Sequence, residues 1–167
     1  LLSDLRLLRQ ESRETVGLNV RDGDRRVTVE RLDTSFEVRF VIDLGSPQPL
    51  HAGAAGKAIL AFQPDQEIAE IVSRAELSSR REKQLMKDLE EIQRQGFSDT
   101  CGERVPGSRS ISAPILNHEG VAIASVSVLS LESRMQRREV SKCCRLVKIT
   151  ASEISSEIGF ADYSRVA

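Results

Sequence analysis

The segment Gly53-Ala54-Ala55-Gly56 has the composition of a site that binds a small anion. The residues that follow it, through Leu60, predict a helix whose first turns lie within this segment. The first amides of a helix have no acceptor inside it, and the helix dipole makes that end positive. A carboxylate can therefore bind at the amides of Ala54 and Ala55. Small residues also let a helix lie close to a sheet, and the residues alone leave both interpretations open.

The same segment contains Gly56-Lys57, as a nucleotide-binding P-loop does, but it does not complete that motif. A P-loop has glycine five residues before Gly56, where this chain has His51. It also has serine or threonine after the lysine to hold magnesium, and here that residue is Ala58. We therefore exclude nucleotide hydrolysis.

The other reactive side chains form no predicted catalytic or metal site. His51 and His118 lie far apart in the sequence and do not have the spacing of metal ligands. Cys143 and Cys144 are adjacent, so on a helix their side chains point about 100° apart. Cys101, in a glycine-flanked loop, is a candidate nucleophile, but the sequence places no base near it. We expect no catalytic residue, no metal and no cofactor, and an enzyme using Cys101 is kept as an alternative.

Two β-hairpins are predicted from alternating apolar residues around turn residues. The predicted strands lie on both sides of Asp22-Gly23, over Glu37–Leu44, and over Ser110–Leu116 and Val121–Leu129. Pro47 and Pro49 are expected to end regular structure. On the last strand Ser125, Ser127 and Leu129 share one face, so the two hydroxyls either bind a ligand or face water.

Helices are predicted in one block between the hairpins and at both ends of the chain. They cover residues 2–13, the segment after Gly53, a stretch opened by Pro64, a stretch from Ser79 to Gly96, and Met135–Gly159. Ser79 and Glu82 are predicted to form a capping box. Residues 96–107 are predicted to be a polar loop that could close over a pocket. Strands in hairpins and helices in a block indicate an α+β fold, with helices flanking one antiparallel sheet.

Composition narrows the class of protein. The 167 residues suit one domain, and their net charge of −1 argues against a nucleic-acid surface, which needs clustered Lys and Arg. Three cysteines give no disulfide framework and fit a reducing cytosol. No apolar run approaches the roughly 18 residues of a membrane span. We therefore expect a cytoplasmic protein that does not contact the membrane.

The chain resembles the C-terminal effector-binding domains of IclR-family transcriptional regulators over nearly its whole length. The matching segments are Glu14–Leu18, Asp22-Gly23, Pro49–Ala52, Gly56–Ala58, Gly96-Phe97, Glu103–Gly107, Ser112–Ile115 and Ser127. Their order and spacing together are specific, although no single segment is. The resemblance implies a GAF-like fold and a winged helix-turn-helix domain N-terminal to this chain. It also implies that residues 1–14 are a linker helix and residues 15–167 the effector-binding domain.

The resemblance further implies a pocket for a small organic acid. Carried over position by position, the residues around it are Ala54, Ala55, Thr100, Ser110, Ser127 and Leu129. The implied partners are this acid, further copies of the chain in a homodimer or homotetramer, and DNA through the N-terminal domain alone. Residue types and resemblance thus agree on the same helix start.

Two departures from the family pattern bear on the ligand. The family often has Ser-Gly-Pro where this chain has Leu129-Ser130-Leu131, and some members have an acidic residue where this chain has Thr100. Both departures make the pocket less polar, so we expect an acid with an apolar body, such as an aromatic or branched acid. A pure oligomerisation domain with an unoccupied pocket is the second alternative.

Overall fold

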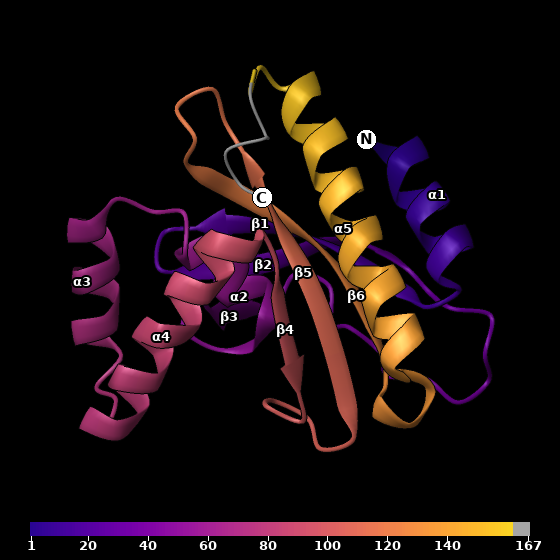
Figure 1. Ribbon diagram of the computed structural model, residues 1–167, viewed down its shortest axis with the longest axis horizontal. Coiled ribbons are helices and arrows are strands. Elements are labelled where there is room, and N and C mark those ends of the chain that lie inside the picture. Colours follow the sequence, from indigo (N-terminus) through magenta and orange to yellow (C-terminus); the bar gives the residue numbers. More distant parts are fainter. Residues whose placement is uncertain (162–167) are drawn as a thin grey trace.

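The computed structural model describes residues 1–161, which fold around a six-stranded antiparallel sheet (Figure 1). The strands are β1 (Thr15–Asp22), β2 (Arg25–Leu32), β3 (Pro47–Pro49), β4 (Ser98–Cys101), β5 (Ser108–Leu116) and β6 (Ala122–Leu131). Their order across the sheet is β3-β2-β1-β6-β5-β4. Both predicted hairpins are confirmed, and β1 pairs with β6 to join them into one sheet.

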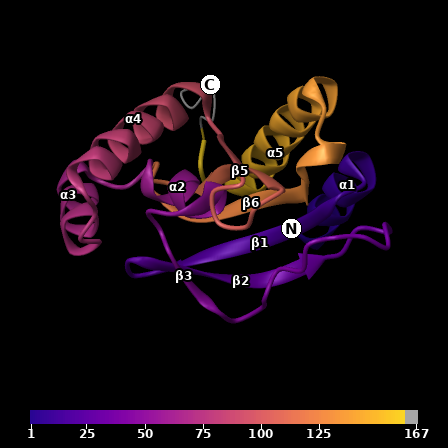
Figure 2. The same cartoon turned by 90° about the horizontal axis from the view of Figure 1, so that it is seen from below.

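Helices cover both faces of the sheet, which confirms the predicted α+β class (Figure 2). The helices are α1 (Leu2–Ser12), α2 (Gly53–Leu60), α3 (Asp65–Arg74), α4 (Ser79–Gln95), the short 3-10 helix η1 (Glu132–Arg134) and α5 (Arg137–Glu157). α1 and α5 lie on one face, and α2 lies on the other with α3 and α4 outside it. Within residues 1–161 no helix is long and apolar enough to cross a membrane.

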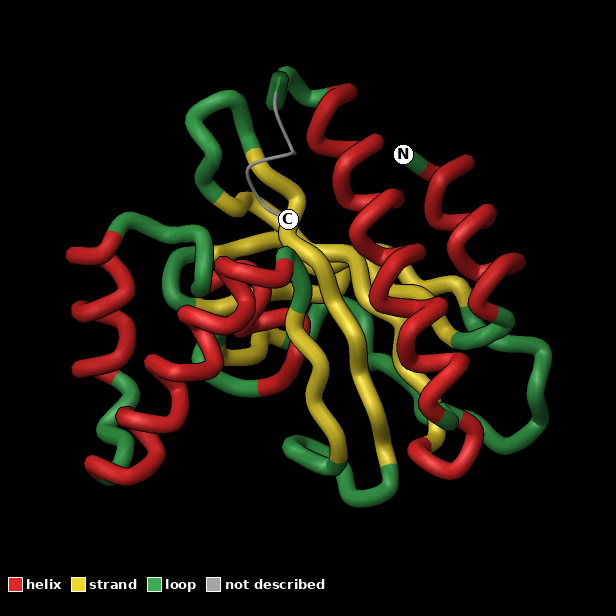
Figure 3. Tube along the Cα trace, in the orientation of Figure 1, coloured by secondary structure: helices red, strands yellow, loops and turns green. Residues whose placement is uncertain are grey.

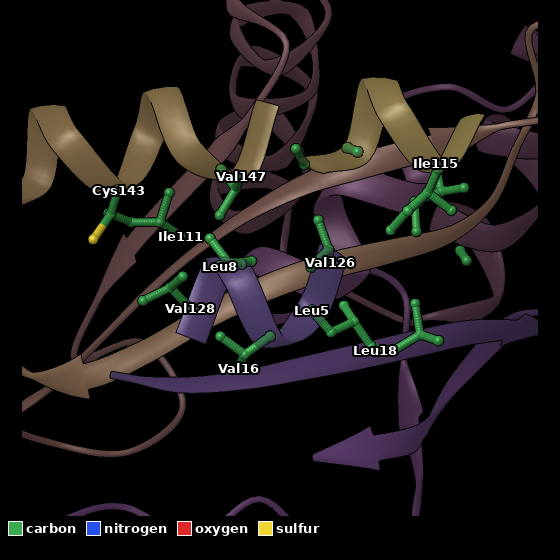
Figure 4. Close-up of a cluster of buried hydrophobic side chains, with 14 of the residues drawn as sticks. Leu5, Leu8, Val16, Leu18, Ile111, Ile115, Val126, Val128, Cys143 and Val147 are labelled. Carbon is green, nitrogen blue, oxygen red and sulfur yellow. The ribbon is translucent and has the colours of Figure 1, made fainter. Parts of the chain in front are cut away.

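The alternation of side chains along the strands gives the sheet one apolar face and one partly polar face. On β6, Val126 and Val128 belong to the core under α1 and α5, together with Leu5 and Val147 (Figure 4). Every second residue points the other way, so Ser125 and Ser127 face the side of the sheet on which α2 lies. These serines are buried, and the predicted alternative that they face water is wrong.

The segment between β2 and β3 departs from the prediction. Residues 37–44 form a loop rather than a strand (Figure 3). Backbone carbonyls of this loop accept hydrogen bonds from arginine side chains. Arg31 Nη1 donates to the carbonyl of Ile42 at 2.6 Å, and Arg134 Nη1 donates to the carbonyl of Val38 at 2.9 Å. The neighbouring prediction is also wrong, because residues 47–49 form an edge strand. Proline is tolerated there, since an edge strand leaves some amides without a ladder partner.

Three further predictions need correction. The loop predicted over residues 96–107 contains β4, which pairs with β5. The capping box is absent, because Ser79 is already helical and Ser78, at the N-cap position of α4, makes no side-chain cap hydrogen bond. The apolar stripe of α5 is shifted, since Cys143 is buried and Cys144 only partly so, while Ile158 lies beyond the helix and is exposed. Gly96 ends α4 as predicted, in a left-handed conformation with φ 79°.

Candidate ligand-binding site

A cavity of about 190 Å³ lies between the start of α2 and the polar face of the sheet. All six residues that the resemblance assigns to a pocket line it, namely Ala54, Ala55, Thr100, Ser110, Ser127 and Leu129. They come from α2, β4, β5 and β6, which are far apart in the sequence. The fold thus brings the predicted residues together around one space.

The start of α2 is built so that its first amides point out of the helix. Ala52 is extended and Gly53 has a φ of 75°, which L side chains rarely adopt. The amide of Gly53 donates to Oε1 of Glu103 at 3.0 Å, so an internal carboxylate already binds the first amide. The next two amides, of Ala54 and Ala55, belong to the first turn and have no acceptor within the helix. Both alanines are buried and line the cavity.

A hydrogen bond from Ser125 holds α2 against the sheet. The serine hydroxyl donates to the carbonyl oxygen of Ala55 at 3.1 Å, and Ser125 is fully buried. This serine therefore positions the helix rather than lining the cavity. The two interpretations of the small-residue segment are compatible, because the close packing of α2 on β6 is what brings its first amides to the cavity.

A chain of hydrogen bonds runs across the floor of the cavity. Arg26 Nη1 and Thr28 Oγ1 both donate to Oδ1 of Asn19, at 2.7 and 2.9 Å. Nδ2 of Asn19 then donates to Oγ of Ser127 at 2.7 Å. Because Ser127 accepts this bond, its own proton is left to donate to an acceptor in the cavity.

The loop between β2 and β3 forms the outer wall. Phe40, Val41 and Ile42 line the cavity and give it an apolar side. The loop is held by the two arginine bonds to its carbonyls described above and by Phe36, whose ring centroid lies 4.6 Å from the Arg134 guanidinium. The cavity therefore has polar groups on its floor and at α2, and an apolar wall opposite.

Sequence reasoning missed the polar floor on β1 and β2. Asn19, Arg26 and Thr28 are buried and line the cavity. The sequence pattern that could have indicated this floor is the polar residue at every second position of the strand, as in Arg26-Val27-Thr28. The pattern alone does not show which polar residues meet, because the β-bulge between Leu18 and Asn19 sets Asn19 opposite Thr28.

A second, larger hollow of about 630 Å³ lies between α4 and β4 and contains Lys57. Lys57 Nζ contacts Asp88 Oδ2 at 2.8 Å and Glu103 Oε2 at 2.7 Å. Burial lowers the pKa of Lys57, but the two carboxylates outweigh burial and raise the pKa above its ordinary value. Lys57 thus holds Glu103 against the start of α2 by charge.

This ion pair predicts a dependence of stability on pH. Since the folded-state pKa of Lys57 is raised, its contribution is fully present below pH 10.5 and is lost as the pH rises through the folded-state pKa. We expect Lys57→Met to unfold more easily than the parent at neutral pH, with a gap that narrows above pH 10.5. Urea unfolding of both proteins across this range measures it. A gap that stays constant at high pH would show that packing, and not charge, causes the difference.

Cys101 and His51 lie in the larger hollow and not in the cavity at α2. Cys101 is exposed, and a hydrogen bond to Glu132 is the largest cause that raises the pKa of its thiol. A raised pKa leaves less thiolate, which is the nucleophilic form. Burial lowers the pKa of His51. The structure therefore does not activate Cys101 as the nucleophile that the enzymatic alternative requires.

The sequence and the structure both match known proteins. The family described as "Bacterial transcriptional regulator IclR C-terminal" matches residues 3–156. The HTH-type transcriptional repressor AllR of Escherichia coli K12 is 31% identical over 161 residues, covering 93% of this chain and 59% of AllR. The HTH-type transcriptional regulator KdgR of Dickeya chrysanthemi is 28% identical over 165 residues, covering 95% of this chain and 54% of KdgR. This chain thus spans little more than half the length of these two relatives.

Among solved structures, the Thermotoga maritima IclR has a TM-score of 0.89 at 27% identity, covering 95% of this chain and 67% of that one. Its likeness confirms that the predicted α+β fold is of the GAF-like type.

Proposed function

Because the chain belongs to the IclR family of bacterial transcriptional regulators, as their C-terminal effector-binding domain, we propose that its cavity at α2 binds a small organic acid. The carboxylate lies at the amides of Ala54 and Ala55. Ser127 donates its free proton to the ligand from the floor, and Thr100, Ser110 and Leu129 complete the wall. The apolar body of the acid packs against the loop between β2 and β3.

The observation that carries this proposal is the convergence of two donor sets on one small space. Ala54 and Ala55, in the first turn of α2, and Ser127, on β6, all line the cavity. Its volume of about 190 Å³ is below the roughly 300–1,000 Å³ of sites for drug-sized ligands, so it suits a small metabolite.

The expected affinity follows from these contacts. A helix start favours an anion by about 0.3–1 kcal/mol when exposed and by up to roughly 2 kcal/mol when partly buried. Hydrogen bonds to a charged group add about 1.5–3 kcal/mol each. A few such bonds with an apolar contact reach about −8 kcal/mol, which is micromolar affinity. That range suits a sensor of metabolite concentration.

The relatives are transcriptional regulators and not enzymes, so we assign no catalysis to this chain. The remaining parts of the proposal concern the whole protein. Residues 1–14 link to an N-terminal winged helix-turn-helix domain, which alone contacts DNA. The protein acts in the cytoplasm as a homodimer or homotetramer.

Titration calorimetry with aromatic and branched monocarboxylates tests the proposal, beginning with benzoate and 4-methylpentanoate. Mass spectrometry of small molecules that stay bound through purification guides the choice of further acids. We expect at least one acid to bind with about micromolar affinity. If no acid binds while the purified domain is folded, the oligomerisation alternative is favoured and the proposal fails.

A further inference from the structure

Arg26, on the floor of the cavity, is a buried cation without a counter-ion in the part of the chain that the structure describes. Its side chain lines the cavity, and the residue is 6% exposed. Within residues 1–161 the side chain of Arg26 makes one hydrogen bond, from Nη1 to Oδ1 of Asn19, and its buried Nε has no partner. Burial, and then the charge of nearby Arg104, lower the pKa of Arg26 to about 10, which still leaves it charged at neutral pH.

The acidic residues around the cavity do not neutralise this charge. Glu103 is bound to Lys57 and to the amide of Gly53. Asp43, on the outer loop, is exposed and forms no ion pair in the described residues. Buried charges in proteins are ordinarily paired. An unpaired guanidinium that faces a cavity is therefore suited to an anion that enters from outside.

The position of Arg26 relative to α2 supports the same conclusion. The carbonyl of Ala55 lies above Ser125, and Ser125 is opposite Asn19 on the neighbouring strand. Arg26 contacts Asn19 directly and faces the same side of the sheet. The guanidinium and the first amides of α2 thus border the same space, and one ligand can contact both.

We propose that Arg26 is the charge partner of the ligand's anionic group, so that the cavity selects fully charged acids over neutral analogues of the same shape. This inference rests on the proposed function and names the property by which that site chooses its ligand. Asn19 does not require Arg26 for its own position, because Thr28 also donates to its Oδ1. If Arg26 served only to position Asn19, its buried Nε would have no reason to remain without a hydrogen-bond partner.

A matched pair of probes, 4-methylpentanoate and 4-methylpentanamide, tests this inference. They have nearly the same shape and differ in charge. We expect the parent to bind the acid at least about tenfold more tightly than the amide, and Arg26→Met to lose most of this preference. Thermal unfolding without ligand is measured in parallel, because removing an uncompensated buried charge should leave the melting temperature unchanged or higher.

Arg21→Met is the matched control. Arg21 is also partly buried, but it is paired with Glu67 and lies outside the cavity. We expect this control to melt at a lower temperature than the parent and to keep the preference for the acid.

The outcomes distinguish failure of the role of Arg26 from failure of the proposed function. The role of Arg26 is overturned if Arg26→Met keeps the acid preference, or if it melts as low as Arg21→Met. Equal binding of acid and amide to the parent overturns the role of Arg26 and leaves ligand binding intact. Failure of the parent to bind any acid overturns the proposed function, and the role of Arg26 with it.

Discussion

Replacing Ala55 with aspartate is expected to abolish binding of the organic acid, with a loss of at least about a hundredfold in affinity. Ala55 is 5% exposed, lines the cavity and belongs to the first turn of α2. Its replacement places a negative charge and additional bulk where the ligand's carboxylate lies. Titration calorimetry with the acid that binds the parent best measures the effect.

Two companion variants separate this effect from misfolding. Ala69→Asp places the same charge on the exposed side of α3 and should leave binding unchanged. Ser127→Ala removes one donor to the ligand and should weaken binding by about tenfold, with the fold retained by circular dichroism. If Ala55→Asp is folded and binds as tightly as the parent, the small-residue segment serves packing alone and the ligand binds elsewhere.

Gly56→Ala is expected to lower the free energy of unfolding by about 1–3 kcal/mol and to weaken ligand binding as well. A Cβ at this position would lie 2.7 Å from the carbonyl oxygen of Leu50 and 2.8 Å from that of Pro49. Both are backbone atoms, so α2 must move away from the segment that precedes it. Since this contact sets where α2 begins, its first amides move too. Urea unfolding and calorimetry measure the two effects.

Gly17→Ala is the control for the added methyl group. There the closest atom is Cδ1 of Ile42, at 3.1 Å, which is the end of a flexible side chain. We expect this variant to lose less stability than Gly56→Ala. Equal losses in both would mean that the close approach of α2 to residues 49–50 has no special role.

Local sequence patterns predicted the parts of the site that depend on nearest neighbours. The start of α2 follows from four small residues, and the face shared by Ser127 and Leu129 follows from the alternation of a strand. The hairpins follow from their turn residues. In each case the signal and the structure lie within a few residues of one another.

The polar floor could not be predicted in the same way, because it depends on pairing between distant strands. Arg26 meets Asn19 across the first hairpin, and Asn19 meets Ser127 across a strand pair more than a hundred residues apart in sequence. The bulge in β1 decides which face these residues share. The loop over residues 37–44 was mistaken for a strand because the arginines that bind its carbonyls, Arg31 and Arg134, lie outside it.

A crystal structure of the chain with 4-methylpentanoate bound shows where the organic acid binds. We expect the carboxylate within hydrogen-bonding distance of the amides of Ala54 and Ala55 and of Ser127 Oγ, with the Arg26 guanidinium beside it and the branched end against Phe40. Density for the acid in the larger hollow beside Lys57, with the cavity at α2 unchanged, would mean that the cavity at α2 is not the ligand-binding site.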